Sequence, residues 1–207
     1  MKSSIKMPQH SNTTISFSGA DGVGKSTQIM LLKQYFENNG ITYRILYARA
    51  GYNKICLSLL KRINKRPTVL NRGLYRFINY MQINYLFGVL KEVKKNNQVL
   101  LMDRTLIDSV VDESMVLKKE FKIPKIIRGR KKTREIRIYL DADIDNIEKR
   151  IKNRGEKFNY EYVETQLALY LRLFELNKDQ FIYIDANRDE ESVFKDVLNI
   201  LLVGGKI

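Results

Sequence analysis

Apolar and polar residues alternate along this chain with two different periods. Residues 14–18 alternate with the period of two that is typical of a strand, whereas residues 27–40 carry apolar side chains every three or four positions, as one face of a helix does. Residues 41–47 are rich in β-branched and aromatic side chains and predict a second strand. A strand, a helix and a strand within so short a span form a βαβ unit, which predicts a parallel sheet.

The same alternation continues to the end of the chain. Residues 98–102 form a continuous apolar run, as expected of a central strand in a parallel sheet. A long helix precedes this run, with Asn71 as its expected cap and its end near residue 95. The other predicted elements are helices at 55–65 and 106–118, a strand at 136–140, helices from 144 and at 161–177, a strand at 181–186 and a helix at 190–202.

Five strands alternating with helices predict one α/β domain of three layers, with a five-stranded parallel sheet and helices on both of its faces. We assign this domain to residues 13–207, because residues 1–12 are polar and predict a flexible N-terminal tail. A chain of 207 residues is large enough for one well-buried core and rather short for two.

The composition indicates the compartment in which we expect the protein. No apolar run approaches the ~18 residues that a membrane span needs, and the tail lacks the apolar stretch of a secretory signal. A single cysteine, Cys56, excludes an internal disulfide and fits a reducing compartment. We therefore expect a cytoplasmic protein without a membrane partner.

The chain is strongly basic. It carries 37 lysines and arginines against 23 aspartates and glutamates, which gives a formal net charge of +14. Such a charge is found in nucleic-acid-binding proteins, but it also suits a lysine-rich surface with a basic site for a polyanionic small molecule. The densest basic cluster, at residues 128–134, is accompanied by no known nucleic-acid-binding motif. We therefore favour a nucleotide over a nucleic acid as the partner.

A glycine-rich segment at residues 19–27 follows the first predicted strand and opens the first helix. It has the spacing G-x-x-x-x-G-K-[ST] of a phosphate-binding loop. In such a loop backbone N–H groups point at phosphate oxygens, Lys25 reaches the β- and γ-phosphates, and Ser26 binds Mg²⁺. The alternative is a turn that merely contains Lys-Ser, but the flanking strand and helix favour nucleotide binding. The predicted ATP-binding residues here are Gly19, Asp21, Gly22, Val23, Gly24, Lys25, Ser26 and Thr27.

Two further features indicate phosphoryl-transfer chemistry. The apolar strand 98–102 ends in Asp103, and a carboxylate at this place is typical of the magnesium-associated carboxylate of phosphate-loop enzymes. Ser26 and Asp103 are therefore the predicted metal ligands. Arg150 and Arg154 are four residues apart on a predicted helix and share one face. They form either a solvated helix end or a lid whose cations close over the transferring phosphoryl group.

Taken in order, these segments resemble the thymidylate kinase family of nucleoside monophosphate kinases, from Ile15 to Leu202. Residues 19–28 are similar to that family's own version of the phosphate loop, and Asp103-Arg104 matches its Asp-Arg pair. Residues 139–143, followed by residues 150–155, resemble its strand, helix and lid, and residues 184–187 resemble its last-strand loop beside the adenine. The ordered series is more specific than any single motif.

The resemblance implies a P-loop fold with a lid, and transfer of a phosphoryl group from ATP to a nucleoside monophosphate, with dTMP as the default acceptor and Mg²⁺ as the cofactor. It also implies residue roles. Asp21 would face the acceptor, and Arg49 and Arg104 would grip the acceptor phosphate, for which the planar guanidinium is well suited. The expected catalytic residues are Lys25, Asp103, Arg104, Arg150 and Arg154.

The resemblance also implies which residues lie beside the acceptor base and the adenine, and how the chain assembles. Phe77 and Gln82 on the long helix would lie at the acceptor base, and Ala186 and Asn187 would lie beside the adenine of ATP. The family's habit of dimerising predicts a homodimer, with the helix around residues 75–90 as a candidate surface.

Several departures from the family pattern lie on the acceptor side. Glycine stands at position 22, where some members carry a catalytic arginine, so the lid arginines are expected to supply that cation. The family's Glu-Pro-Gly-Gly becomes residues 50–53, its thymine-reading arginine falls near Gln82, and its Ala-Tyr-Gln falls near Val111-Asp112-Glu113. Kinase chemistry is therefore better supported than thymidylate specificity. Two alternatives stay open: a kinase of this fold with a different acceptor, and a nucleotide-dependent nucleic-acid-binding protein.

Overall fold

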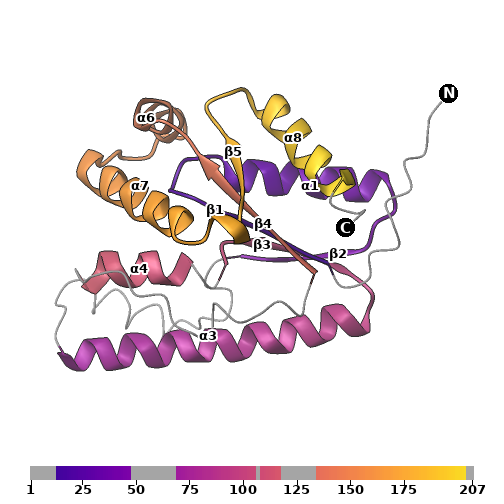
Figure 1. Ribbon diagram of the computed structural model, residues 1–207, viewed down its shortest axis with the longest axis horizontal. Helices are drawn as coiled ribbons and strands as arrows, with labels where there is room; N and C mark the ends of the chain where they lie inside the picture. The colour runs from indigo at the N-terminus through magenta and orange to yellow at the C-terminus, as the bar shows by residue number, and fades with distance from the viewer. Residues whose placement is uncertain (1–12, 48–68, 106–107, 118–133, 204–207) are drawn as a thin grey trace.

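The computed structural model describes residues 13–47, 69–105, 108–117 and 134–203. All strand pairs in the described chain are parallel, and they form one five-stranded sheet in the order β2-β3-β1-β4-β5 (Figure 1). The strands are β1 (Thr13–Ser18), β2 (Tyr43–Leu46), β3 (Val99–Asp103), β4 (Arg134–Asp141) and β5 (Ile182–Asp185). The predicted α/β sheet is confirmed.

Helices cover both faces of the sheet. The helices are α1 (Lys25–Asn38), α3 (Val69–Lys95), α4 (Asp108–Leu117), α6 (Ile144–Asn153), α7 (Tyr160–Glu175) and α8 (Glu190–Val203), and η1 (Lys178–Gln180) is a 3₁₀ turn. Helices α1 and α8 pack together on one face, and α4 contacts both α3 and α7 on the other (Figure 1). In the described part of the chain, no helix combines the length and the apolar content that crossing a bilayer would require.

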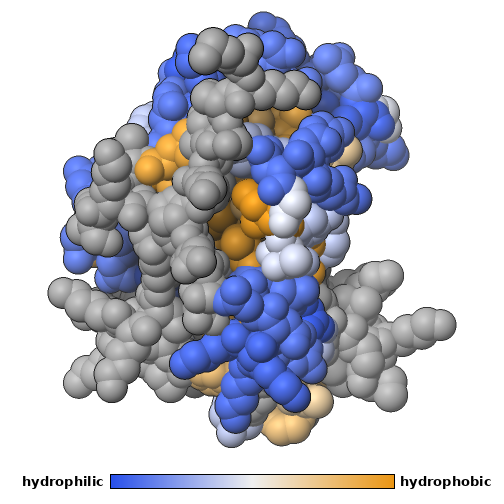
Figure 2. Space-filling model, turned by 90° about the vertical axis from the view of Figure 1, so that its right-hand side faces the viewer, coloured by the Kyte–Doolittle hydropathy of each residue, from blue (hydrophilic) through white to orange (hydrophobic). Residues whose placement is uncertain are grey.

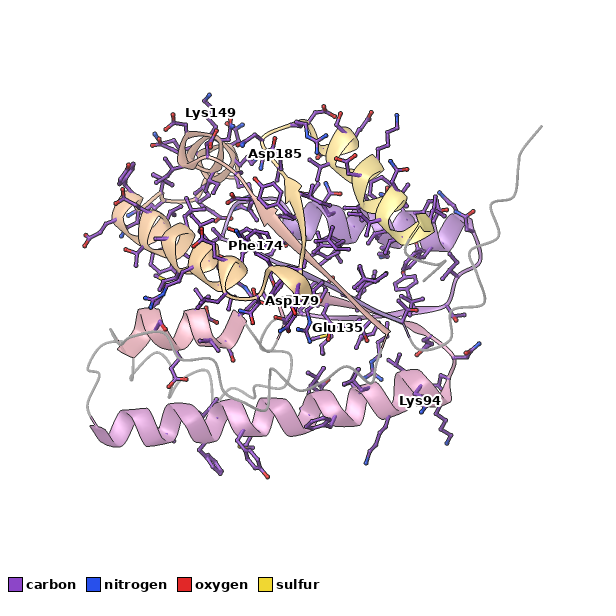
Figure 3. The ribbon with its side chains drawn as sticks, in the orientation of Figure 1. Lys94, Glu135, Lys149, Phe174, Asp179 and Asp185 are labelled. Carbon is purple, nitrogen blue, oxygen red and sulfur yellow. The ribbon has the colours of Figure 1, made fainter. Side chains whose placement is uncertain are left out.

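The core lies between these layers. All six residues of β1 are buried, as its central place in the sheet requires. Tyr139 of β4 stacks on Phe174 of α7 with ring centroids 5.0 Å apart, and Phe174 points to the interior while Lys94 and Lys149 point outward (Figure 3). The side view in Figure 2 shows a hydrophobic band between hydrophilic upper and lower parts, as expected where the layers meet.

The strand register brings the carboxyl ends of β1 and β3 together, because Phe17 pairs with Asp103. On the other side of β1, Ser18 pairs with Tyr139. The chain leaves β1 toward β2 and β3 and later crosses to β4, so the direction of winding reverses at β1. Open α/β sheets bind ligands outside the carboxyl ends of the strands at such a point.

Predicted element boundaries agree with the structure to within a few residues, with one error. Asn71 does not cap the long helix, because α3 already includes Val69 and Asn71 lies within it. Asparagine is a common N-cap but is also tolerated inside a helix, so sequence alone misplaced the start. The predicted tail, the helix at 55–65 and most of the basic cluster at 128–134 lie outside the described residues.

Candidate active site

The phosphate-binding loop runs from the end of β1 to the first residue of α1. Gly19 has φ of 141°, and a Cβ atom at this position would lie 2.4 Å from the carbonyl oxygen of Leu140 in β4. Only glycine therefore allows the loop to pass so close to the neighbouring strand. Gly24, with φ of 110°, precedes the first turn of α1, whose backbone N–H groups face the loop.

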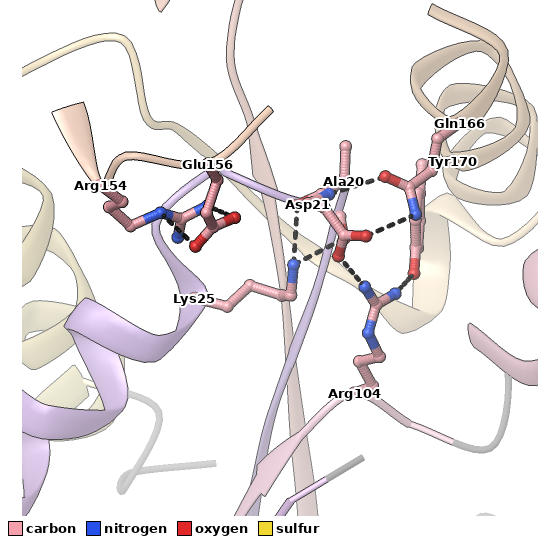
Figure 4. A network of polar contacts seen from close by, with 9 residues as sticks. Ala20, Asp21, Lys25, Arg104, Arg154, Glu156, Gln166 and Tyr170 are labelled. Atoms are coloured by element: carbon pink, nitrogen blue, oxygen red, sulfur yellow. Dashed lines mark hydrogen bonds and ion pairs between the residues drawn. The ribbon is translucent and has the colours of Figure 1, made fainter. Parts of the chain in front are cut away.

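Lys25 is buried beneath the loop. Its Nζ donates hydrogen bonds to the carbonyl oxygens of Gly19 at 2.9 Å and Ala20 at 2.7 Å (Figure 4). Burial, aided by the charge of Arg104, lowers the pKa of Lys25 to about 8, against nearby carboxylates that act in the opposite direction. The ammonium is thus held at the loop by carbonyl oxygens that phosphate oxygens could replace.

Asp103 lies at the end of β3, next to the loop. Its Oδ1 is buried and has no hydrogen-bond partner in the described structure. Burial raises the pKa of this carboxyl group above its usual range, against the opposing charges of Lys25 and Arg104. Ser26 lines the same cavity as Asp103. A buried carboxylate oxygen without a partner beside a hydroxyl oxygen is a donor set that fits Mg²⁺.

Arg104 follows Asp103 and adopts the left-handed backbone conformation, with φ of 76°. Its backbone N–H donates to the Phe17 carbonyl oxygen at 2.9 Å, which fixes this turn against β1. Its guanidinium group donates to Tyr170 and pairs with Asp21 of the loop (Figure 4). Burial alone lowers the pKa of Arg104, but Tyr170 and Asp21 outweigh it and raise that pKa. Arg104 is therefore a permanent cation beside the loop, at the end where Asp21 lies.

Two residues of α7 that the sequence analysis did not select complete this network. Tyr170 contacts Arg104, and the Oε1 of Gln166 accepts a hydrogen bond from the backbone N–H of Asp21 at 2.7 Å. Both side chains are buried. Gln166 could have been identified from its helical position, because it is a polar residue on the same face as the core residues Val163 and Leu173.

Asp108 is a third residue that the sequence analysis missed. Its Oδ2 accepts hydrogen bonds from the Ser18 hydroxyl at 2.7 Å, the Thr105 backbone N–H at 2.5 Å and the Thr105 hydroxyl at 2.6 Å. This buried carboxylate ties the end of β1 to the turn after β3 and also acts to raise the pKa of Lys25. From sequence it looks like an ordinary acidic residue in the first turn of a helix.

One cavity of 390 Å³ joins these groups. Its lining contains residues of the loop, the end of β3 and the segment after α6, so the geometry brings together most of the predicted donor-phosphate, metal and catalytic residues. The predicted residues that line it are Asp21, Gly22, Gly24, Lys25, Ser26, Thr27, Asp103, Arg104 and Arg154.

The two predicted lid arginines are in different situations. Arg150 donates to the carbonyl oxygens of Val23 at 3.0 Å and Ala186 at 2.6 Å, so its guanidinium group bridges the loop and the turn after β5. Arg154 follows the end of α6 and pairs with the Glu156 carboxylate, with Nε 3.2 Å from Oε1. Arg154 is largely exposed and lines the 390 Å³ cavity.

A second cavity, of 400 Å³, shares loop residues and Arg154 with the first and is also lined by Arg150, Ala186 and the start of α8. Asn187 is placed differently from its neighbour Ala186. The Oδ1 of Asn187 accepts from the Asp143 backbone N–H at 2.8 Å and from the Asn146 side chain at 3.0 Å. Its side chain therefore connects the turn after β5 to the start of α6.

Of the three other predicted acceptor residues, the described structure places the side chain of Phe77 alone. Phe77 lies on α3 with 58% of its surface exposed, and it is not among the described residues that line either cavity. The backbone of Gln82 lies in α3, and Arg49 lies outside the described residues. Of the predicted acceptor residues, Asp21 and Arg104 are the two that the described structure places at the 390 Å³ cavity.

Gly22 is expected to tolerate no side chain, including the arginine that some family members have. Its φ is 86°, and a Cβ atom would lie 2.9 Å from both Ile147 and Ile151 of α6. We expect Gly22→Ala to lower the free energy of unfolding by roughly 1–2 kcal/mol for the left-handed backbone and by a further ~1–3 kcal/mol for the contact, measured by urea unfolding. Gly155→Ala is the matched control, because Gly155 has φ of 73° but open space around its Cβ position. Equal losses in the two variants would contradict this explanation.

The ammonium group of Lys25 predicts a pH dependence. Its pKa of about 8 means that the free protein loses this positive charge as the pH rises through that value. We expect kcat/KM for ATP, which reports the free enzyme, to fall up to about tenfold per pH unit on the alkaline side. The fall in kcat should come at higher pH, because bound phosphates stabilise the ammonium form. In Lys25→Arg this alkaline fall in kcat/KM should be absent, however much activity remains. If the variant still shows the fall with the same midpoint pH, a group other than Lys25 causes it.

Comparisons with known proteins agree with this geometry. A family model described as thymidylate kinase matches residues 17–197. The thymidylate kinase of Fervidobacterium nodosum is 26% identical over 193 residues, covering 90% of this chain and 96% of that protein. The thymidylate kinase of Caldanaerobacter subterraneus subsp. tengcongensis is 27% identical over 206 residues, covering 93% and 98%.

The fold also matches solved structures. The structure of deoxyadenosine kinase from M. mycoides with bound dATP superposes with a TM-score of 0.59 at 20% identity, covering 91% of this chain and 98% of that one. At this identity the likeness shows the fold alone. The family model, in contrast, spans most of this chain, including the loop, Asp103-Arg104 and both lid arginines. The chain therefore belongs to the thymidylate kinase family and is an ATP-dependent nucleoside monophosphate kinase.

Proposed function

We propose that this protein transfers the γ-phosphoryl group of ATP to dTMP. The observation that carries the proposal is the 390 Å³ cavity, in which the donor-phosphate loop with Lys25 faces the acceptor-side pair of Asp21 and Arg104. A donor phosphate on the loop and an acceptor phosphate on Arg104 would lie next to each other in this cavity. Such positioning is the main task in phosphoryl transfer.

The donor side follows from the loop and the second cavity. The backbone N–H groups of the loop and the start of α1 would bind the phosphates, and these would draw Lys25 away from the Gly19 and Ala20 carbonyl oxygens. The adenine would occupy the 400 Å³ cavity beside Arg150 and Ala186. In this arrangement Arg150 holds the walls of the donor site together.

Mg²⁺ fits the proposal. Ser26 and Asp103 would hold the ion, because both line the cavity and Asp103 has a buried oxygen without a partner. Bound there, the ion would neutralise charge on the β- and γ-phosphates during transfer. The raised pKa of Asp103 reflects burial, and a nearby divalent charge would favour its ionised form.

The acceptor side depends on Arg104. An incoming phosphate would compete with Asp21 and Tyr170 for its guanidinium group and, as a dianion, would form stronger hydrogen bonds with it. An oxygen of the acceptor phosphate then forms a bond to the γ-phosphorus as the bond to the bridging oxygen of ADP breaks. Arg154 is a cation that can approach the transferring group, since it lines this cavity, is exposed and is held by an ion pair at the surface.

The experiment is a coupled assay of ADP release across nucleoside monophosphates. We expect dTMP to give the highest kcat/KM. Turnover with another monophosphate but not with dTMP would support the kinase activity and overturn the proposed specificity for dTMP. Absence of turnover with every monophosphate would overturn the proposal.

A different acceptor is the second candidate, and a specific feature favours it. The charges of Asp112 and Asp108 both act to raise the pKa of Arg104, so the acceptor side is acidic around its one described cation. Asp112 stands near the place where the family has an aromatic residue. A carboxylate there would suit an acceptor that presents a hydrogen-bond donor, such as an exocyclic amine. Preference for an amine-bearing nucleotide in the same panel, lost in Asp112→Asn, would support this candidate over dTMP.

Assembly as a homodimer and a cytoplasmic location stay predictions from the family resemblance. The exposed apolar side chains of α3 support a homodimer, because four of them recur at helical spacing on one side of the helix: Phe77, Tyr80, Met81 and Tyr85. Light scattering, which gives the mass in solution, tests this directly.

A further inference from the structure

Helix α7 places two buried polar side chains at the site, Gln166 against the phosphate-binding loop and Tyr170 against Arg104. Gln166 is only 1% exposed and Tyr170 is fully buried, one helical turn further on. The rest of this face is apolar, with Val163 and Leu173 in the core. A buried amide lowers stability unless its hydrogen bonds are made, so the partners of Gln166 explain why it is there.

Both ends of the Gln166 amide contact Asp21. Its Oε1 accepts from the Asp21 backbone N–H at 2.7 Å, and its Nε2 lies 3.5 Å from the Asp21 Oδ2. The other carboxylate oxygen, Oδ1, pairs with Arg104 (Figure 4). Asp21 is therefore held from two sides, by α7 and by the turn after β3.

The peptide group between Ala20 and Asp21 is also held on both sides. Its N–H donates to Gln166, and its carbonyl oxygen accepts from Lys25 Nζ at 2.7 Å. A peptide group is planar, so a contact that fixes its N–H also fixes its C=O. Gln166 thereby sets the orientation of a peptide that lies between the donor-side lysine and the acceptor-side carboxylate.

We propose that Gln166 is a positioning residue for the acceptor, acting through Asp21. This inference rests on the proposed function. The amide holds the Asp21 carboxylate where it can meet both Arg104 and the acceptor. Without the amide, the carboxylate and the peptide behind it lose their fixed orientation, while the donor-binding N–H groups of the loop and α1 remain.

The first variant is Gln166→Met, which keeps the length of the side chain and removes both hydrogen-bonding groups. We expect the KM for the acceptor to rise by about tenfold or more, as for loss of a hydrogen bond to a charged group. The KM for ATP should change by less than about threefold, since none of the lost bonds is made to the donor. Initial rates with each substrate varied in turn measure the two constants separately.

The second variant, Gln166→Glu, gives a readout that a merely structural role would not move. The new carboxylate still accepts from the Asp21 N–H but repels the Asp21 carboxylate. Once protonated it can donate to that carboxylate as the amide does, and burial raises its pKa toward neutrality. We therefore expect kcat/KM for the acceptor, relative to wild type, to recover as the pH falls from about 8 to about 6.

The matched control is Asn177→Leu. Asn177 is also a buried amide, just beyond the end of α7, and its Nδ2 donates to the Leu173 carbonyl oxygen at 2.8 Å, away from the loop. This variant should lower the Tm of the protein without raising the KM for the acceptor. It separates the loss of a buried hydrogen bond near α7 from the loss of this particular one.

The outcomes separate this inference from the function on which it rests. Wild-type protein that neither turns over nor binds any nucleoside monophosphate in calorimetry overturns both. Wild-type turnover, with both KM values changed equally in Gln166→Met, or with the pH profile of Gln166→Glu parallel to wild type, overturns only the role of Gln166. A selective rise in the KM for the acceptor, together with recovery at lower pH, supports it.

Discussion

Arg154→Ala is expected to lower kcat by about 10³–10⁵-fold, the range for removal of an arginine that stabilises the transition state of phosphoryl transfer. That loss corresponds to roughly 4–7 kcal/mol of transition-state stabilisation. Arg154 borders both cavities, but its described contact is an exposed ion pair with Glu156, so we expect the KM for ATP to change far less than kcat. Steady-state rates at saturating acceptor measure both constants.

The structure favours Arg154 over Arg150 for this role. The Arg150 guanidinium group is engaged by the backbone carbonyl oxygens of Val23 and Ala186, and leaving them would open the donor site. Lys152→Ala is the control, because Lys152 is 64% exposed and pairs with Glu148 on the same helix. It should retain wild-type activity, since such surface pairs contribute little. If Arg154→Ala behaves as wild type, the catalytic cation is not in the lid segment after α6.

Lys25→Ala is expected to lower kcat by at least about 10²–10³-fold, the usual cost of losing one donor that stabilises transition-state charge. Lys25 lies directly against the loop backbone, where its Nζ donates to the carbonyl oxygens of Gly19 and Ala20. Lys33→Ala on the same helix is the control, because Lys33 is exposed and forms only an i,i+4 pair with Glu37. Comparable activity of the two variants would remove Lys25 from the mechanism.

Lys25→Ala should also change how the free energy of unfolding depends on pH. The folded-state pKa of Lys25 is about 8, below its usual value of 10.5, so between these values the unfolded chain binds more protons than the folded one. This group therefore makes the free energy of unfolding increase as the pH rises through that window. Lys25→Ala should lose this contribution, which urea unfolding at several pH values would show.

The layered fold could be predicted because strands and helices leave local patterns in the sequence. A buried parallel strand such as β3 is a continuous apolar run, and the amphipathic helices repeat with their own period. The loop could be predicted for the same reason, because Gly19, Gly24 and Lys25 belong to one short continuous segment. The start of α3 was not, because Asn71 has the chemistry of a cap but the helix begins before it.

The contacts that orient the site could not be predicted, because they join residues far apart in sequence. Asp21 and Gln166 are separated by 145 positions, and Arg104 and Tyr170 by 66. No local pattern indicates which buried polar side chain will meet which loop. The pair Arg150 and Arg154 shows the same limit: their spacing is that of one helical face, but α6 ends at Asn153, so only Arg150 is held by the helix.

The doubly held peptide between Ala20 and Asp21 has a thermodynamic consequence. If a polyphosphate binds the loop as proposed, Lys25 would leave this carbonyl oxygen, and the same peptide plane carries the N–H that anchors Asp21. Occupancy of one substrate site would then change the affinity of the other, and by linkage the factor would be the same in both directions. The two substrates should not bind independently, and the order in which they are added cannot alter that coupling.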